Sequence, residues 1–169
     1  MIQKLPFALI GLLILLLGFF LYTEHKAPVP GEGLMVYEGT NYTFSYPDGY
    51  VVTPTPEGVS MVRSDDTVAP IAGEGPTGIT ITMHPLNEGE TLTQWLENGA
   101  SNYELGAETH TSALVNSMEA VRYSWSGLYE GDTTAFIQGN QVVAISRTWL
   151  SRGDHTHAYE TVLRTYARQ

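Results

Sequence analysis

The stretch YTFSYPDGYVV, residues 42–52, restricts the fold more than any other part of the sequence. Its first five residues alternate aromatic and small polar side chains, which is typical of a β-strand with one apolar and one polar face. Pro47 cannot donate a hydrogen bond to a neighbouring strand, and Asp48-Gly49 favours a turn. We therefore expect a strand over Tyr42–Tyr46 that stops at Pro47, with the chain resuming at Tyr50.

Upstream of this stretch, the segment from Leu5 to Thr23 contains no charged residue. As a helix, Leu5–Tyr22 would be about 27 Å long, close to the roughly 30 Å hydrocarbon core of a bilayer. A cleavable signal peptide is the alternative, because Lys4 precedes the segment. The apolar run is longer than a signal peptide requires, however, and no small-x-small cleavage site follows it. These features favour an uncleaved anchor over residues 1–23, with a transmembrane helix over about 5–22.

Residues 24–33, EHKAPVPGEG, separate the expected anchor from the rest of the chain. Their prolines and glycines oppose both a continued helix and packing, so they predict a short linker. Residues 34–169 then form one domain of ordinary size. Lys4 lies before the span, and basic residues favour the cytoplasmic side, so we expect the N-terminus inside and this domain outside a cytoplasmic membrane. A tether this short would keep a protein partner near the membrane surface.

The domain is strongly acidic. From Leu34 onward it has six arginines, no lysine and sixteen aspartates or glutamates. Such a surface repels phosphate backbones, which argues against nucleic-acid binding. The 169-residue chain also has no cysteine, which excludes disulfides, thiolate catalysis and a cysteine-linked lipid anchor.

Further alternating patterns predict strands over 34–38 and 59–63 and another strand that begins at Ile79. Residues 64–78, between the second and third of these strands, are expected to form a long loop, and long ordered loops are often functional. Thr91 and Gln94 have capping-box spacing, which predicts a helix over about 92–101. An antiparallel meander is expected over 120–150, with a turn at Glu130–Asp132 and a tight hairpin turn at Gly139-Asn140.

The last helix is expected to begin at Asp154, whose side chain can cap it. It carries an apolar stripe, which we expect to cover one face of the sheet, since apolar pairs of the Gly139-Asn140 hairpin fall on both faces. The fold class is therefore α+β, an antiparallel sheet of six or seven strands flanked by two helices. The stripe consists of Tyr159, Val162, Leu163 and Tyr166.

This order of elements, over about residues 37–166, resembles the PsbP-like family. In that family an early aromatic strand runs into proline and a turn, and the matching positions here are Phe44, Tyr46, Pro47, Gly49 and Tyr50. Tyr50 stands where tryptophan is common. The resemblance implies an α/β/α sandwich that serves as a non-enzymatic accessory or interaction domain, in photosynthetic assemblies or in bacterial envelope proteins. It assigns no binding residue.

The sequence GDHTH contains the one concentrated group of ionisable residues, Asp154, His155 and His157. Together with His84 or His110 they could bind zinc. Residues two apart at a helix start do not share a face, however, and Asp154 is already explained as a cap. We therefore expect both histidines to be exposed to solvent.

No GxSxG, GxGxxG or P-loop motif is present, so we assign no catalytic, cofactor-binding or metal residue. Most aromatic residues have the period of core positions, and Trp149 is the candidate for an exposed one. The leading hypothesis is a membrane-anchored, non-enzymatic accessory or interaction domain on the extracytoplasmic side of a prokaryotic membrane. Two alternatives stay open: a small metal-dependent hydrolase that uses Asp154, His155 and His157, and an envelope assembly subunit that acts through its transmembrane span.

Overall fold

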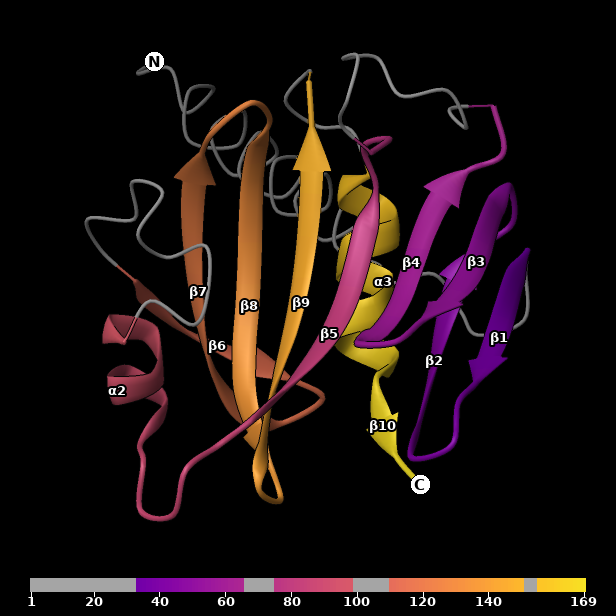
Figure 1. The fold of residues 1–169 in the computed structure, drawn as a ribbon. Helices are drawn as coiled ribbons and strands as arrows, with labels where there is room; N and C mark the ends of the chain where they lie inside the picture. The colour runs from indigo at the N-terminus through magenta and orange to yellow at the C-terminus, as the bar shows by residue number, and fades with distance from the viewer. Residues whose placement is uncertain (1–32, 66–74, 99–109, 151–154) are drawn as a thin grey trace, which may run out of the picture. The chain divides into compact units, whose positions relative to one another are not determined.

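The computed structural model describes residues 33–65, 75–98, 110–150 and 155–169 (Figure 1). The expected membrane anchor over 1–23 and nearly all of the linker lie outside these residues. Within them, no helix combines the length and apolarity needed to cross a membrane. The strands are β1 (Leu34–Glu38), β2 (Tyr42–Pro47), β3 (Tyr50–Thr55), β4 (Gly58–Arg63), β5 (Ile79–Pro85), β6 (Thr111–Val115), β7 (Met118–Ser126), β8 (Glu130–Gln138), β9 (Gln141–Trp149) and β10 (Ala167–Arg168), and the helices are α2 (Leu92–Glu97) and α3 (Thr156–Thr165).

The stretch 42–52 forms β2 and β3, and the expected turn lies between them. Gly49 has a φ of 87°, and its N–H donates to the side chain of Asp48 at 2.8 Å. The two strands do not pair with each other: β2 lies between β1 and β10 in a three-stranded sheet, whereas β3 is an edge of the large sheet. The Pro47-Asp48-Gly49 turn is therefore a corner between two sheets, and the expectation of a single sheet is corrected.

The large sheet has seven strands in the order β3-β4-β5-β9-β8-β7-β6, and neighbouring strands are antiparallel (Figure 1). Its β8–β9 hairpin turns at Gly139-Asn140, where Gly139 has a φ of 67°, and it pairs Phe136 with Val143. The tight hairpin turn is thus confirmed. The expected turn at Glu130–Asp132 is wrong, because these residues begin β8. Gly131 is required there by packing, since a Cβ would lie 2.3 Å from the ring of Trp125.

Helix α2 covers one face of the large sheet. Thr91 and Gln94 form the expected capping box, with Gln94 N–H donating to Thr91 Oγ1 at 3.2 Å and Thr91 N–H donating to Gln94 Oε1 at 2.8 Å. Trp95 and Leu96 are buried against this face of the sheet. The end of the predicted helix, beyond Asn98, lies outside the described residues.

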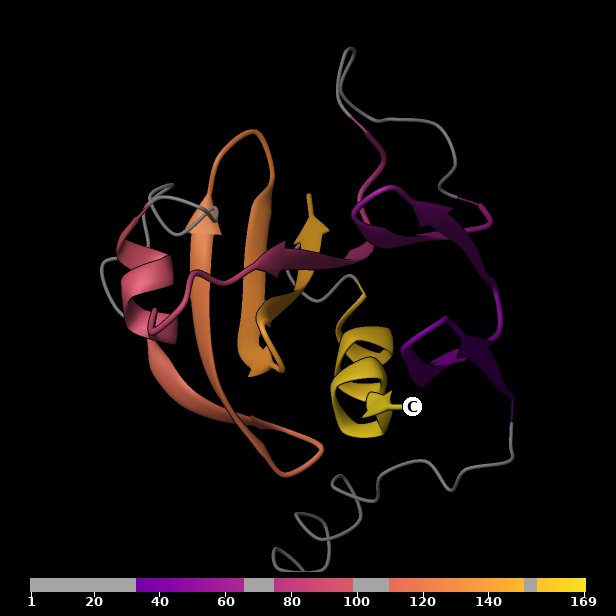
Figure 2. The ribbon, with the colours of Figure 1, turned by 60° about the horizontal axis from the view of Figure 1, so that its bottom comes forward.

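Helix α3 covers the opposite face and lies between the two sheets (Figure 2). Tyr166, just after α3, stacks on Tyr42 of β2 with ring centroids 5.5 Å apart and meets Phe136 of β8 edge-on at 5.3 Å. The expected apolar stripe of α3 is buried and therefore confirmed. The layers are α2, the seven-stranded sheet, α3 and the three-stranded sheet.

Candidate functional site

The histidines do not gather into one site. His84, on β5, lies on the α2 side with its ring 5.4 Å from that of Trp95, and His110 and His157 are exposed. Asp154, the expected cap of the last helix, lies outside the described residues, and the N-cap of α3 is His155. In the part of the chain that the structure describes, no group of three or more His, Cys, Asp or Glu side chains is placed to hold a metal ion.

His155 is buried, so the expectation that it is exposed to solvent is wrong. It stands at the N-cap of α3 with a φ of 60°, makes no side-chain cap bond and is only 6% exposed. Its Nδ1 lies 2.9 Å from the hydroxyl of Tyr50, and its Nε2 lies 3.4 Å from Oγ1 of Thr77. Because both ring nitrogens have polar partners in the interior, burying this imidazole costs little.

A hollow of about 490 Å³ lies beside the Tyr50–His155 pair. Its walls are the turn after β2, the end of β4 and the first turn of α3. Arg63 and Asp65 line it and form an exposed ion pair of 2.8 Å. Asp48 lines the hollow as well, so charges of both signs are present there.

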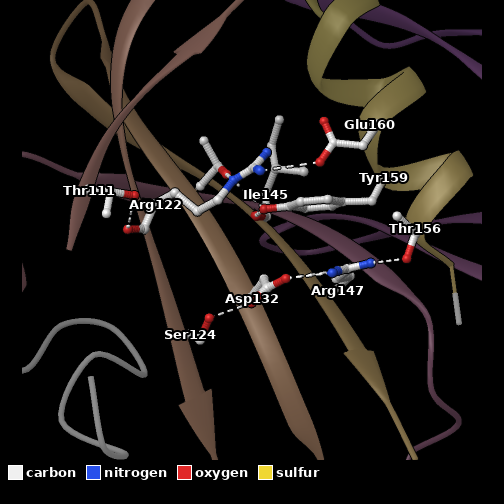
Figure 3. Close-up of polar contacts among 10 residues, drawn as sticks. Thr111, Arg122, Ser124, Asp132, Ile145, Arg147, Thr156, Tyr159 and Glu160 are labelled. Atoms are coloured by element: carbon white, nitrogen blue, oxygen red, sulfur yellow. Dashed lines mark hydrogen bonds and ion pairs between the residues drawn. The ribbon is translucent and has the colours of Figure 1, made fainter. Parts of the chain in front are cut away.

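A cluster of polar contacts joins α3 to the large sheet (Figure 3). Arg147 of β9 pairs with Asp132 of β8 at 2.6 Å, and their side chains are only 13% and 16% exposed. The same guanidinium stacks over Trp149 at 4.6 Å and donates to the hydroxyl of Thr156 at the start of α3. Trp149, the candidate for an exposed aromatic residue, is buried.

Tyr159 of α3 lies in the middle of this cluster, and the guanidinium groups of Arg122 and Arg147 are 5.4 and 5.3 Å from its ring (Figure 3). Its hydroxyl bonds Thr134 at 2.7 Å, and burial raises its pKa above the usual tyrosine value. Arg122 also pairs with Glu160 at 3.2 Å. Tyr159, at the centre, is wholly buried between helix and sheet, so the cluster positions α3 and offers no access to a substrate.

A larger hollow, of about 1150 Å³, lies on the α2 side of the large sheet. Leu114 of β6 is 68% exposed there and Ile137 of β8 is 41% exposed. We call this surface the β6 shelf. The residues that line it include Leu92, Ser112, Leu114, Glu119, Val121 and Ile137.

No protein-family model and no curated protein matches the sequence. Among solved structures, the chain is similar to cyanobacterial PsbP (CyanoP) from Synechocystis sp. PCC 6803, with a TM-score of 0.54. That match covers 85% of this chain and 96% of the other. The chain has a PsbP-like fold. The sequences are 11% identical, so the likeness concerns the fold, and the resemblance stated from residues 42–50 is confirmed at that level.

The charges of this PsbP-like domain are unevenly distributed. Arg122 and Arg147 point from the large sheet to α3, and Arg164 belongs to α3 itself. None of the described arginines lines the β6 shelf, whereas Glu119 does. Two further acidic residues, Glu88 and Glu90, precede α2, and Glu97 is its last residue. Among the described residues, the shelf of the PsbP-like domain is thus lined mainly by apolar side chains, with the acidic Glu119 on β7 between Leu114 of β6 and Ile137 of β8.

Reasoning from sequence did not find this shelf. Leu114 and Ile137 are distant in the chain and line one hollow only because β6 and β8 both pair with β7 in the sheet. The one local signal was the apolar pair Ile137 and Val142, which indicated that the second face of the sheet needed cover. In the PsbP-like domain α2 buries Val142 but leaves Ile137 partly exposed.

Proposed function

We propose that this chain is a membrane-anchored accessory protein whose PsbP-like domain binds another protein on the extracytoplasmic side of a prokaryotic membrane. The observation that carries this proposal is the β6 shelf, with exposed Leu114 and Ile137 around one hollow. Contiguous exposed apolar surface of this kind marks sites of interaction. The similarity in fold to cyanobacterial PsbP supports an accessory role.

The membrane part of the proposal rests on the uncharged segment Leu5–Tyr22 and on the linker that follows it. The domain begins with β1 at Leu34, directly after that linker, so a short tether would hold it close to the bilayer. Lys4 before the span favours a cytoplasmic N-terminus.

A binding role is better supported than hydrolysis, because the candidate catalytic groups are dispersed. His84 lies on the α2 side of the sheet, whereas His155 lies on the α3 side and is buried against Tyr50. Metal ligands must converge within about 2 to 3 Å of one point. These two imidazoles are separated by the sheet and cannot do so.

The test uses the full chain with a tag after Gln169, produced in its own cells. We expect it in the membrane pellet after alkaline carbonate washing, and we expect protease added outside spheroplasts to remove the tag. A photo-crosslinking amino acid at one exposed apolar position at a time (Met35, Val51, Leu114 or Leu128) should yield an adduct with a second protein from at least one of them. A chain in the soluble fraction contradicts the anchored part, and no protein adduct from any position contradicts the binding part.

A further inference from the structure

Among the described strands, β6 is an edge of the large sheet, since β7 is its one neighbour in the sheet order. Asn116 and Ser117 form the two-residue turn that joins them, with φ values of 43° and 70°. Val115 and Met118, next to that turn, are then a hydrogen-bonded pair, and the alternate positions point their backbone groups outward. Ser112 and Leu114 are those outward positions, and no described residue bonds their backbone N–H or C=O groups.

The same two residues line the β6 shelf. The exposed backbone edge and the apolar hollow are therefore parts of one surface. Neighbouring strands lie about 4.8 Å apart, so a strand added to β6 would place every second side chain on the face that carries Leu114, at the outer rim of the hollow. Main-chain bonds would supply affinity, and the shelf would select the side chains.

The opposite edge of the sheet is protected against such pairing. Pro54 lies in β3 and pairs with Val59 next to the tight turn between β3 and β4. By the same alternation its backbone nitrogen points outward, where proline has no N–H to donate. Strand β6, of sequence TSALV, contains neither proline nor a charged residue. Of these two edges, β6 is the one left able to accept a strand.

Charge decides which strand fits. Glu119 stands opposite Leu114 on β7 and lines the shelf, and from Leu34 onward the sequence has sixteen acidic residues against six arginines. A second copy of this chain would bring the same excess of negative charge to the edge, which disfavours self-pairing. A partner with positive charge is favoured instead.

We infer that β6 and its shelf bind an extended segment of a partner protein in which apolar side chains alternate and lysine or arginine residues flank them. This inference rests on the proposed function, since it names the partner's chemistry and the place where it binds. The bound segment adds a strand beside β6, contacts Leu114 with its apolar side chains and pairs its flanking cations with Glu119.

The test uses the full chain in a mild detergent and a labelled synthetic peptide of alternating valine and threonine flanked by lysines. One copy of the peptide has glutamate in place of lysine, and another has its alternate amides N-methylated. We expect the lysine peptide to bind at least about tenfold more tightly than either copy. It should also slow hydrogen exchange at the amides of Ser112 and Leu114.

Two variants locate the site. Ser112→Pro removes an outward N–H without removing a bond to β7, and Leu114→Ser removes the exposed apolar side chain. Each variant should bind the lysine peptide about fivefold or more weakly than the unchanged chain does. The matched control is Leu128→Ser, because Leu128 is 65% exposed but lies in the β7–β8 turn, away from the shelf. Circular dichroism checks that Ser112→Pro folds, and Leu114→Ser carries the test if it does not.

Equal binding of the N-methylated peptide, equal binding of the glutamate peptide, or unchanged exchange at Ser112 and Leu114 would overturn the inference. Sedimentation that shows a dimer broken by Ser112→Pro would also overturn it, in favour of a second copy. If the peptide results are negative while crosslinking from another face still captures a protein, the proposed function stands and only the β6 site is lost.

Discussion

The hydroxyl of Tyr50 lies 2.9 Å from Nδ1 of His155, although 105 positions separate the two residues in the chain. Tyr50 is the first residue of β3, directly after the corner turn at Gly49, and His155 is the N-cap of α3. The contact therefore ties the corner between the two sheets to the helix that lies between them. Tyr50, directly after the turn, therefore helps to hold α3 in place through this hydrogen bond.

Replacing Tyr50 with phenylalanine tests that role. The change removes the hydroxyl and leaves the Nδ1 of a buried imidazole without this partner, so we expect the free energy of unfolding to fall by about 1 to 2 kcal/mol. Urea unfolding followed by tryptophan fluorescence measures it. Tyr46→Phe is the control, because among the described residues no partner bonds its hydroxyl, and it should change stability by less than about 0.5 kcal/mol. Equal effects of the two changes would contradict this account of the contact.

The mostly buried Arg147–Asp132 ion pair should contribute more to stability than the exposed Arg63–Asp65 pair. Asp132→Asn leaves a mostly buried guanidinium without its countercharge, which should lower the free energy of unfolding by about 3 kcal/mol. Asp65→Asn breaks the exposed pair with Arg63, whose side chains are 45% and 65% exposed, and should cost less than about 1 kcal/mol. Thermal or urea unfolding of both variants gives the comparison. A similar loss in the two would mean that burial does not control the strength of these pairs.

Gly78 and Gly75 precede β5 and differ in the space around them. A Cβ at Gly78 would lie 2.3 Å from the carbonyl oxygen of Met61, whereas at Gly75 nothing lies within 4 Å. Gly78→Ala should therefore destabilise the fold by about 1 to 3 kcal/mol, because the backbone of β4 must move. Gly75→Ala should leave the midpoint of unfolding almost unchanged. A neutral Gly78→Ala would show that the close approach of the two strands is not required.

Stability is expected to fall at high pH because burial raises the pKa of three tyrosines. The pKa of Tyr42 rises to about 12, and those of Tyr159 and Tyr166 rise as well. Above about pH 10 the unfolded chain loses tyrosine protons that the folded chain keeps. The stabilising contribution is therefore complete below about pH 10 and is lost as the pH rises through the folded-state values.

Urea unfolding at several pH values between about 8 and 12 checks this prediction, with a slope of up to roughly 1.4 kcal/mol per pH unit for each tyrosine. Tyr159→Phe removes one of the three protons and should make the slope shallower, whatever it does to stability at neutral pH. A free energy of unfolding that stays constant or rises across this range would contradict the expectation.

Local patterns in the sequence were sufficient for much of the fold. The alternation over 42–46, the capping box at Thr91 and the glycine turn at Gly139 each depend on neighbouring residues, and the structure confirms all three. The placement of β2 and β3 in different sheets could not be predicted, because Pro47-Asp48-Gly49 is equally suitable for a hairpin and for a corner. Strand partners are chosen by contacts distant in sequence.

The functional surfaces were less accessible from sequence. His155 at a helix start suggested an exposed residue, yet its ring is buried because Tyr50 and Thr77 approach it from other parts of the chain. Glycine at 131 suggested a turn, although it is needed to make room for Trp125. The β6 shelf depends on which strands are neighbours and on which edge is open, and neither is a local property.

Site-specific photo-crosslinking from the β6 shelf, in the cells that make this protein, tests the central claim most directly. A benzophenone amino acid at Leu114 should give a discrete adduct with one protein, the same residue at Leu128 should not, and Ser112→Pro should abolish the Leu114 adduct. The crosslinked segment should contain lysine or arginine beside alternating apolar residues. Equal adducts from Leu114 and Leu128, or no protein adduct from Leu114, would contradict the claim that this edge of the PsbP-like domain binds a partner.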